Sequence, residues 1–247
     1  MGKTISRTAT LVLAVFAAGF AQAAPHWDYK GHHGASHWGE LDKAFEACAK
    51  GTRQSPIDIR MTEKVNLPDL NFQYTAVAPT IWNNGHTVQV NVPSGNKLVV
   101  GDQTYDLLQF HFHTPSEEAI NGKHYPMVAH FVHKNAAGQL GVVGVLIKKG
   151  KKNQDLAPVF EHIPRTGEKI TVDDLTLNLS NLVPANHTYY SFEGSLTTPP
   201  CSEDVNWMVM KHPIELSSIQ IRAFAKTVKF NARPIQPSNN RTIKESL

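Results

Sequence analysis

The stretch Gln109-Phe110-His111-Phe112-His113 is followed in the chain by the similar stretch Val128-Ala129-His130-Phe131-Val132-His133. Both are bulky, apolar and alternating, which is typical of β-strands. Residues i and i+2 of a strand point to one face, so His111 and His113 project together, away from Phe110 and Phe112. A neighbouring strand could bring His130 beside them. Three neutral imidazoles on a rigid sheet predict a zinc site whose fourth position is open to water, a catalytic pattern.

Short β-rich runs continue on both sides of these stretches, and turn residues such as Asn121-Gly122 and Lys149-Gly150 separate them. Strands are expected over residues 87–92, 97–100, 107–113, 127–133, 140–147, 189–193 and 206–211. Helices are expected over residues 40–50, closed by Gly51, and 217–227, with Ser217 or Ser218 as N-cap. The pattern predicts one mainly β (α+β) domain with a few short peripheral helices.

The bulk composition is that of an ordinary globular protein. The chain has 247 residues, of which 41% are hydrophobic and 18% charged, enough for one sizeable domain. Its formal charge is +3, and two of the basic residues lie near the N-terminus. The rest of the chain is close to neutral and gives no support for a nucleic-acid partner.

The N-terminus has the pattern of a secretory signal. Lys3 and Arg7 precede a short apolar core over residues 9–20, and Ala21-Gln22-Ala23 fits a cleavage site. The alternatives are a membrane anchor or a buried first helix. We expect residues 1–23 to be a cleaved signal peptide and residues 24–247 to form the domain. No later segment is long and apolar enough to cross a membrane.

Cys48 and Cys201 are the two cysteines. In an exported chain, which meets oxidising conditions, such a pair suggests one disulfide. Closing a loop of roughly 150 residues would stabilise the fold by about 4–5 kcal/mol on the chain-entropy model. Two buried thiols are the alternative.

Several stretches together resemble the α-class carbonic anhydrases, above all Gly194-Ser195-Leu196-Thr197-Thr198-Pro199-Pro200-Cys201 combined with the spaced histidines. The similarity extends from about His26 to Thr242 and is greatest to the bacterial, exported members. It also includes residues 125–133, Glu117, Trp207, Gln54-Ser55-Pro56-Ile57-Asp58-Ile59, Asn84-Gly85-His86, Asn231-Ala232-Arg233-Pro234 and Gln236-Pro237. The resemblance implies a large, mostly antiparallel, twisted central sheet.

The resemblance also implies roles around a zinc ion (Zn2+). His111, His113 and His130 match the metal ligands, and Gln109 and the backbone of Asn231 match groups that orient ligand imidazoles. Thr197 matches a threonine that accepts a hydrogen bond from zinc-bound hydroxide, and Glu117 matches the glutamate that accepts the threonine's own proton. Without the resemblance, Glu117 and the adjacent Glu118 would be interpreted as surface-loop carboxylates.

Carbon dioxide is uncharged, so the family binds it in a small apolar pocket beside the metal. The matching wall residues are Val132, Val142, Leu196, Thr198 and Trp207; apart from the resemblance, the apolar ones are ordinary core residues.

A histidine with a pKa near 6.5 can carry the released proton to buffer, and His86 matches that shuttle. Tyr29, Asn84 and Gln89 match positions that hold the connecting waters, with Gln89 a variation.

Val128 departs from the family pattern, which often has a glutamate two residues before the third zinc ligand. That carboxylate would lie on the face of His130 and bond its imidazole. Loss of such a partner typically costs about 10–100-fold in metal affinity or activity. We therefore expect weaker or faster-exchanging zinc, unless another group substitutes. His133 points to the face opposite His130 and is interpreted as structural.

The resemblance implies a lyase, carbonate dehydratase, that reversibly hydrates carbon dioxide to bicarbonate and a proton. Anions and sulfonamides should inhibit it at the open zinc position. The compartment implied is the periplasm, with full secretion open, and the protein could be a monomer or a homodimer.

Two alternatives remain. One is a carbonic-anhydrase-like binding domain without catalysis; such a domain should lack one or more of the three ligands. The other is a cupin-type metal oxygenase, in which Glu117 would itself bind iron or manganese. The N-terminal histidines His26, His32, His33 and His37 could bind adventitious metal, but we interpret them as surface or packing groups.

Overall fold

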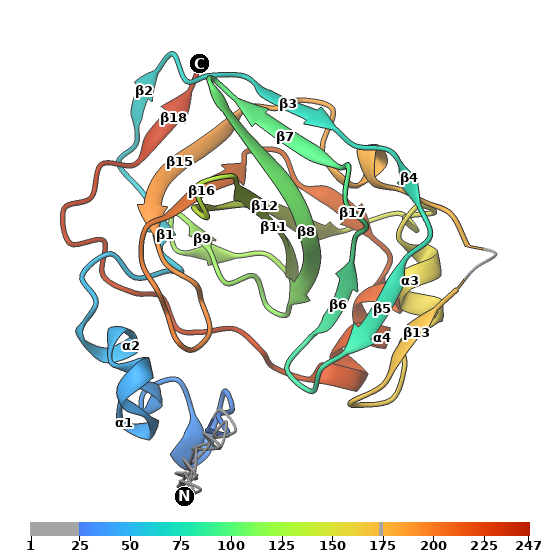
Figure 1. The fold of residues 1–247 in the computed structure, drawn as a ribbon, viewed down its shortest axis with the longest axis horizontal. Helices are drawn as coiled ribbons and strands as arrows, with labels where there is room; N and C mark the ends of the chain where they lie inside the picture. Colours follow the sequence, from blue (N-terminus) through green and yellow to red (C-terminus); the bar gives the residue numbers. More distant parts are fainter. Residues whose placement is uncertain (1–24, 173–174) are drawn as a thin grey trace, which may run out of the picture.

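The computed structural model describes residues 25–172 and 175–247 (Figure 1). The expected signal peptide, residues 1–23, lies outside the described residues. Among the described residues no helix has both the length and the apolar character needed to cross a bilayer.

One large twisted sheet dominates the molecule (Figure 1). At its centre lie β8 (Gln103–His113), β11 (Met127–Asn135) and β12 (Leu140–Lys149). Beyond β8 the order continues through β6 (Val88–Asn91), β5 (Thr80–Asn83) and β13 (Lys169–Thr171). Beyond β12 it continues through β16 (Val205–Met210), β15 (Tyr189–Gly194), β18 (Lys244–Ser246) and β2 (Glu63–Val65).

The remaining strands are peripheral. β7 (Lys97–Val100) pairs with β8 and with β3 (Leu70–Gln73), and β17 (Ile214–Leu216) pairs with β12. Two small sheets contain β1 (Asp58–Ile59), β9 (Ala119–Ile120) and β10 (Lys123–His124), and β4 (Ala76–Val77) with β14 (Leu177–Asn178). In the large sheet, β12–β16, β12–β17 and β18–β2 are parallel and the other pairs are antiparallel. The predicted mainly β fold with a mostly antiparallel sheet is confirmed.

The seven expected strands all form; β7 has the predicted bounds and the other six have shifted ends. The largest shift is in β8, which begins at Gln103. Its first four residues pair with β7 and form a hairpin with it. The sequence did not single out β5, whose four residues Thr80–Asn83 alternate half-buried and buried. A run that short gives too little periodicity to be recognised.

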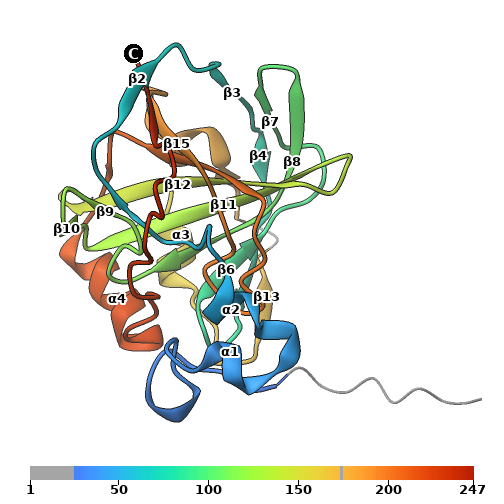
Figure 2. The same ribbon diagram turned by 90° about the vertical axis from the view of Figure 1, so that its left-hand side faces the viewer.

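The expected C-terminal helix is α4 (Ser218–Val228). Ser217 caps it through a reciprocal capping box with Gln220, and Phe224 is buried beneath it. The short helix α3 (Ala157–Glu161) lies beside α4, as both views show (Figure 2).

The continuous helix expected over residues 40–50 is wrong. The chain forms α1 (Trp38–Leu41), a 3-10 turn η2 (Lys43–Phe45) and α2 (Ala47–Lys50). Asp42 adopts an extended backbone and its carboxylate accepts a hydrogen bond from the Ala44 N–H, so it starts a new turn instead of continuing the old one. Two further 3-10 turns are η1 (Gly31–His33) and η3 (Leu179–Leu182).

The central strands separate two apolar clusters, one on each face. Phe110, Phe112 and Phe131 belong to the larger cluster. Val128 and Val142 belong to the smaller one, on the face that carries the paired histidines. The alternation of side chains along β8 and β11 therefore puts polar ligands on one face and aromatic packing on the other.

Candidate metal centre

The ladder between β8 and β11 brings the three histidines together. His111 lies directly opposite His130, and His113 is two residues further along the same face of β8. One nitrogen of each imidazole can be chosen so that the three atoms lie within 4.8 Å of one another. Among the described residues no other group of histidines, cysteines and carboxylates comes together in this way. The predicted convergence of the three histidines on one side of the sheet is confirmed.

Hydrogen bonds at the outer nitrogens fix how each imidazole faces the centre. His111 Nδ1 donates to Gln109 Oε1 (2.8 Å), and His113 Nδ1 donates to the backbone oxygen of Asn231 (2.7 Å). Both rings therefore present Nε2 inward. His113 Nε2 is buried and has no hydrogen-bond partner. A buried unpartnered nitrogen beside two others is what a metal ion would satisfy, so the donor set fits zinc.

Burial sets the charge state of the ligands. It lowers the pKa of His111 to about 3 and that of His113 well below 6.5, and the neighbouring His130 adds to both effects. Both rings are therefore neutral, the form that binds metal. Burial acts to lower the pKa of His130 too, but Glu118 and Glu117 raise it overall. The two carboxylates thus favour a positive charge beside His130. A divalent cation would supply that charge.

Glu117 lies beside His113 and His130 and has no exposed surface. Its Oε1 accepts a hydrogen bond from the Arg233 backbone N–H (2.7 Å), and its Oε2 is 3.4 Å from His113 Nε2. Burial raises the pKa of Glu117 to about 7, while the charge of His130, the Arg233 backbone N–H and the nearby Thr197 side chain act to lower it. Thr197, itself buried, is therefore within reach of the Glu117 carboxylate.

The segment of residues 231–233 bonds both His113 and Glu117. Asn231 gives its backbone oxygen to His113, and its Nδ2 donates to the backbone oxygens of His86 and Phe112. Arg233 holds Glu117 through its backbone N–H. The sequence around Arg233 predicted no role for it, because nothing in the local pattern indicates a contact with residues more than a hundred positions away.

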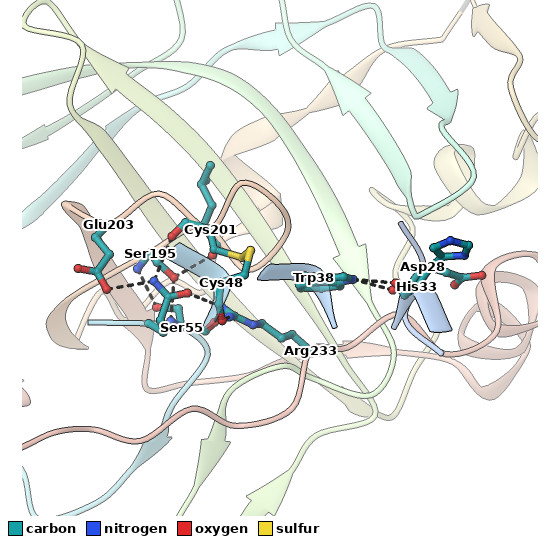
Figure 3. Close-up of a disulfide and its surroundings, with 11 residues drawn as sticks. Asp28, His33, Trp38, Cys48, Ser55, Ser195, Cys201, Glu203 and Arg233 are labelled. Atoms are coloured by element: carbon teal, nitrogen blue, oxygen red, sulfur yellow. Dashed lines mark hydrogen bonds between the residues drawn. A yellow bond between two sulfur atoms is a disulfide. The ribbon is translucent and has the colours of Figure 1, made fainter. Parts of the chain in front are cut away.

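Arg233 also joins the site to the disulfide. Cys48 and Cys201 are bonded, with an S–S distance of 2.10 Å, so the predicted disulfide is confirmed. The Arg233 guanidinium donates to the backbone oxygens of Cys48 and Ser55, at 3.0 and 2.7 Å. Figure 3 shows Arg233 close beside the disulfide.

The residues proposed from the family for the apolar wall lie next to one another. Val132, Val142 and Trp207 are register partners across β11, β12 and β16. The ring of Trp207 meets that of His130 edge to face, with centroids 4.9 Å apart. Leu196 packs against the same cluster, and Thr198 is half-buried in the same loop.

His86 lies in the turn between β5 and β6. The Asn84 side-chain oxygen accepts hydrogen bonds from the backbone N–H groups of His86 and Thr87, which fixes the turn. The His86 ring is half-buried and stacks on Trp27, with centroids 3.8 Å apart. Burial lowers the pKa of His86, and Asp28 partly offsets this. The contact with Trp27 was not predicted, since the N-terminal arm has no periodicity from which to infer its packing.

Gln89 and Tyr29 are the other two residues that the family resemblance assigns to the proton path. Gln89 lies opposite His111 in the β6–β8 ladder, and its Nε2 donates to Asn91 Oδ1 (2.7 Å). Tyr29 is buried, and burial, followed by the charges of Glu117 and Asp28, raises its pKa well above 10.

Glu118 corrects the sequence analysis. It was interpreted as a surface carboxylate, yet its side chain is completely buried. Its Oε2 accepts a hydrogen bond from His130 Nε2 (3.2 Å). Val128, where the family often carries a carboxylate, packs in the apolar cluster instead. The absence of a carboxylate at Val128 was the signal in the sequence that another residue, here Glu118, could bond His130.

The comparisons with known proteins agree with this geometry. The family model for eukaryotic-type carbonic anhydrases matches residues 33–247. A carbonic anhydrase of Pectobacterium carotovorum is 41% identical, covering 94% of this chain and 96% of the relative. One from Neisseria gonorrhoeae is 42% identical, covering 98% of both. The solved α-carbonic anhydrase of Thermovibrio ammonificans, in complex with the inhibitor sulfanilamide, is 42% identical with a TM-score of 0.87, covering 90% of this chain and 99% of that one. This chain therefore belongs to the α-class carbonic anhydrase family, the lyases that hydrate carbon dioxide.

Proposed function

We propose that this protein hydrates carbon dioxide reversibly at a zinc ion held by His111, His113 and His130, with His86 as the proton shuttle. The observation that carries the proposal is the set of imidazole orientations: bonds at the outer nitrogens leave one nitrogen of each ring facing a common centre. Zinc bound there would supply hydroxide near neutral pH, because it lowers the pKa of bound water to about 7.

Thr197 and Glu117 are proposed to orient that hydroxide. A threonine hydroxyl that donates its proton to a carboxylate is left as an acceptor only. Thr197 would therefore accept a hydrogen bond from a hydroxide beside it and hold that group in one orientation toward the substrate. Glu117 can serve as the receiving carboxylate because the Arg233 backbone N–H holds its other oxygen in place. Thr197 and Glu117 would thus orient the hydroxide before the substrate binds. Such prior positioning is how a fixed geometry contributes to catalysis.

The wall formed by Val132, Val142 and Trp207 is proposed to receive carbon dioxide. These side chains are apolar and lie in the same face of the sheet as His130. Leu196 and Thr198 extend the wall from the loop that carries Thr197. An uncharged linear molecule gains little from hydrogen bonds, so an apolar surface beside the reacting group is the suitable site.

His86 is proposed to accept the proton that each cycle releases and to pass it to buffer. Its position in a fixed turn and its half-buried ring let it contact both the interior and solvent. Tyr29, Asn84 and Gln89 are proposed to hold the waters that connect it to the metal. Because burial lowers the pKa of His86, its titration should fall below 6.5.

Anions and sulfonamides are proposed to inhibit by occupying the open metal position. The periplasm is the proposed compartment: a disulfide is typical of exported proteins, and the N-terminal residues have a secretory pattern. A monomer or a homodimer is expected. Membership of the family removes the cupin alternative, which requires a different fold. The binding-domain alternative makes a distinct prediction, namely no hydration by a zinc-loaded protein.

The test is stopped-flow carbon dioxide hydration by the mature chain, residues 24–247. The protein is measured as purified, after chelation, and after re-addition of zinc or, as a control, magnesium. Hydration that disappears on chelation and returns with zinc alone supports the proposal. A protein that contains one zinc per chain and does not hydrate carbon dioxide contradicts it and favours the binding domain.

A further inference from the structure

Glu118 has one polar partner among the described residues, and that partner is a metal ligand. Its Oε1 and Oε2 are 3.1 and 3.2 Å from His130 Nε2. The side chain has no exposed surface, so no water-facing role is open to it. A buried carboxylate without a donor is strongly destabilising, and the His130 N–H is the donor that this one has.

This contact decides which nitrogen of His130 faces the metal. With Nε2 protonated and donating to Glu118, the lone pair of the neutral ring is on Nδ1. Nδ1 points into the cluster, 3.8 Å from Glu117 Oε2. His111 and His113 have the opposite arrangement, because their Nδ1 atoms donate outward and Nε2 faces the centre. His130 is therefore the ligand whose orientation rests on a side-chain carboxylate.

The strand itself does not supply this carboxylate. Val128 is the neighbour of His130 on the same face of β11 and lies opposite His113 in the ladder. It packs among apolar side chains such as Ile57 and Leu146. The acid comes instead from the loop between β8 and β9, where Glu118 directly follows Glu117. Two consecutive residues thus point into one site, one toward each side of the His130 ring.

We propose that Glu118 is the positioning residue for His130: it fixes the ring with Nδ1 toward the metal and thereby slows zinc release, replacing a carboxylate at position 128. The proposal rests on the proposed zinc function but makes its own prediction about metal exchange. Removal of a hydrogen-bond partner behind a metal-bound histidine typically costs about 10–100-fold in metal affinity or activity. The same range is expected here in the rate of zinc loss.

The experiment measures zinc release into excess chromogenic chelator from the zinc-loaded mature chain. Glu118→Ala should release zinc about 10–100-fold faster than the parent. Glu118→Gln, which keeps an acceptor but no charge, should fall between the two. Glu161→Ala, at an exposed glutamate far in the chain from His111, His113 and His130, is the matched control and should release zinc at the parent rate.

A second variant distinguishes positioning from a general loss of stability. The double variant Val128→Glu with Glu118→Ala returns a carboxylate to the same face of β11, and it should release zinc more slowly than Glu118→Ala alone. Ring ¹⁵N spectra of the zinc-loaded proteins give an independent readout: the Nε2–H signal of His130 should shift in Glu118→Gln and stay unchanged in Glu161→Ala.

The proposal is overturned if folded Glu118→Ala and Glu118→Gln both release zinc at the parent rate. It is also overturned if the double variant gives no slower release than Glu118→Ala. Because zinc release is measured without carbon dioxide, a parent that holds zinc but has no hydration activity would refute the proposed function and leave this test intact.

Discussion

His130 and His133 are three residues apart on β11 and have opposite environments. His130 faces two other histidines and two buried carboxylates. His133 lies on the other face, where its Nε2 is 2.6 Å from the Tyr74 hydroxyl and its Nδ1 bonds the Gly141 backbone oxygen (3.2 Å). Burial raises the cost of charge on both rings, yet only the environment of His130 offers negative charge in return. A histidine on a strand is thus a ligand or a core residue according to which face it occupies.

The largest effect is expected from removing the ligand on the metal face. His130→Ala should abolish stoichiometric zinc binding and hydration, because two imidazoles do not complete the three-nitrogen site. Zinc content after gel filtration, with hydration rate, measures this. His162→Ala, at an exposed histidine, is the control. A His130→Ala protein that retains one tightly held zinc would show that the centre lies elsewhere.

A substitution on the face of the sheet opposite the three histidines should lower stability without removing the metal site. Phe131 is buried between Phe110 and Tyr74, stacked with both rings. Phe131→Ala should lower the free energy of unfolding by about 3–5 kcal/mol through the cavity that it leaves. At a temperature where the variant remains folded, it should still bind one zinc. Urea denaturation with zinc analysis tests this, and an undiminished unfolding free energy would contradict the packing role.

His133 predicts a pH dependence of stability that originates on the face opposite the three clustered histidines. Burial lowers the pKa of folded His133 to about 4, against about 6.5 when unfolded. Between these values the unfolded chain binds more protons, so the contribution is complete above pH 6.5 and is lost as the pH falls toward 4. The total is about 3 kcal/mol.

The variant His133→Gln checks this contribution. Its unfolding free energy should change less steeply with pH between 4 and 6.5 than that of the parent. The difference in slope should approach about 1.4 kcal/mol per pH unit in the middle of that window. His162→Gln should follow the parent. Parallel pH profiles for His133→Gln and the parent would exclude His133 as the titrating group.

The smallest effect is expected at His86, which lies outside the central strands. His86→Ala should leave zinc content unchanged and slow turnover in dilute buffer, by up to about 10²-fold for the loss of a proton-transfer group. Small imidazole buffers should restore part of the rate, because they carry the proton in place of the side chain. An unchanged rate in dilute buffer would remove His86 from the mechanism.

The sequence predicted best where short-range alternation decides the structure. The faces of β8 and β11, and with them the positions of the three proposed ligands, follow from a period of two. Glu118, Trp27 and Arg233 could not be placed in this way, because each acts through a residue far away in the chain. The interruption of the expected helix at Asp42 has a different origin: a side chain that bonds a nearby backbone N–H competes with helix continuation.

The segment 231–233 has a consequence for the order in which the protein assembles. It gives a backbone oxygen to His113 and a backbone N–H to Glu117, and its arginine bonds the backbone of Cys48. During synthesis these residues emerge long after β8 and β11. The early strands can pair first, but the ring of His113 and the carboxylate of Glu117 obtain their final partners only when residues 231–233 arrive. Chains shortened before residue 231 should therefore lack a properly formed metal centre even though all three ligand histidines are present.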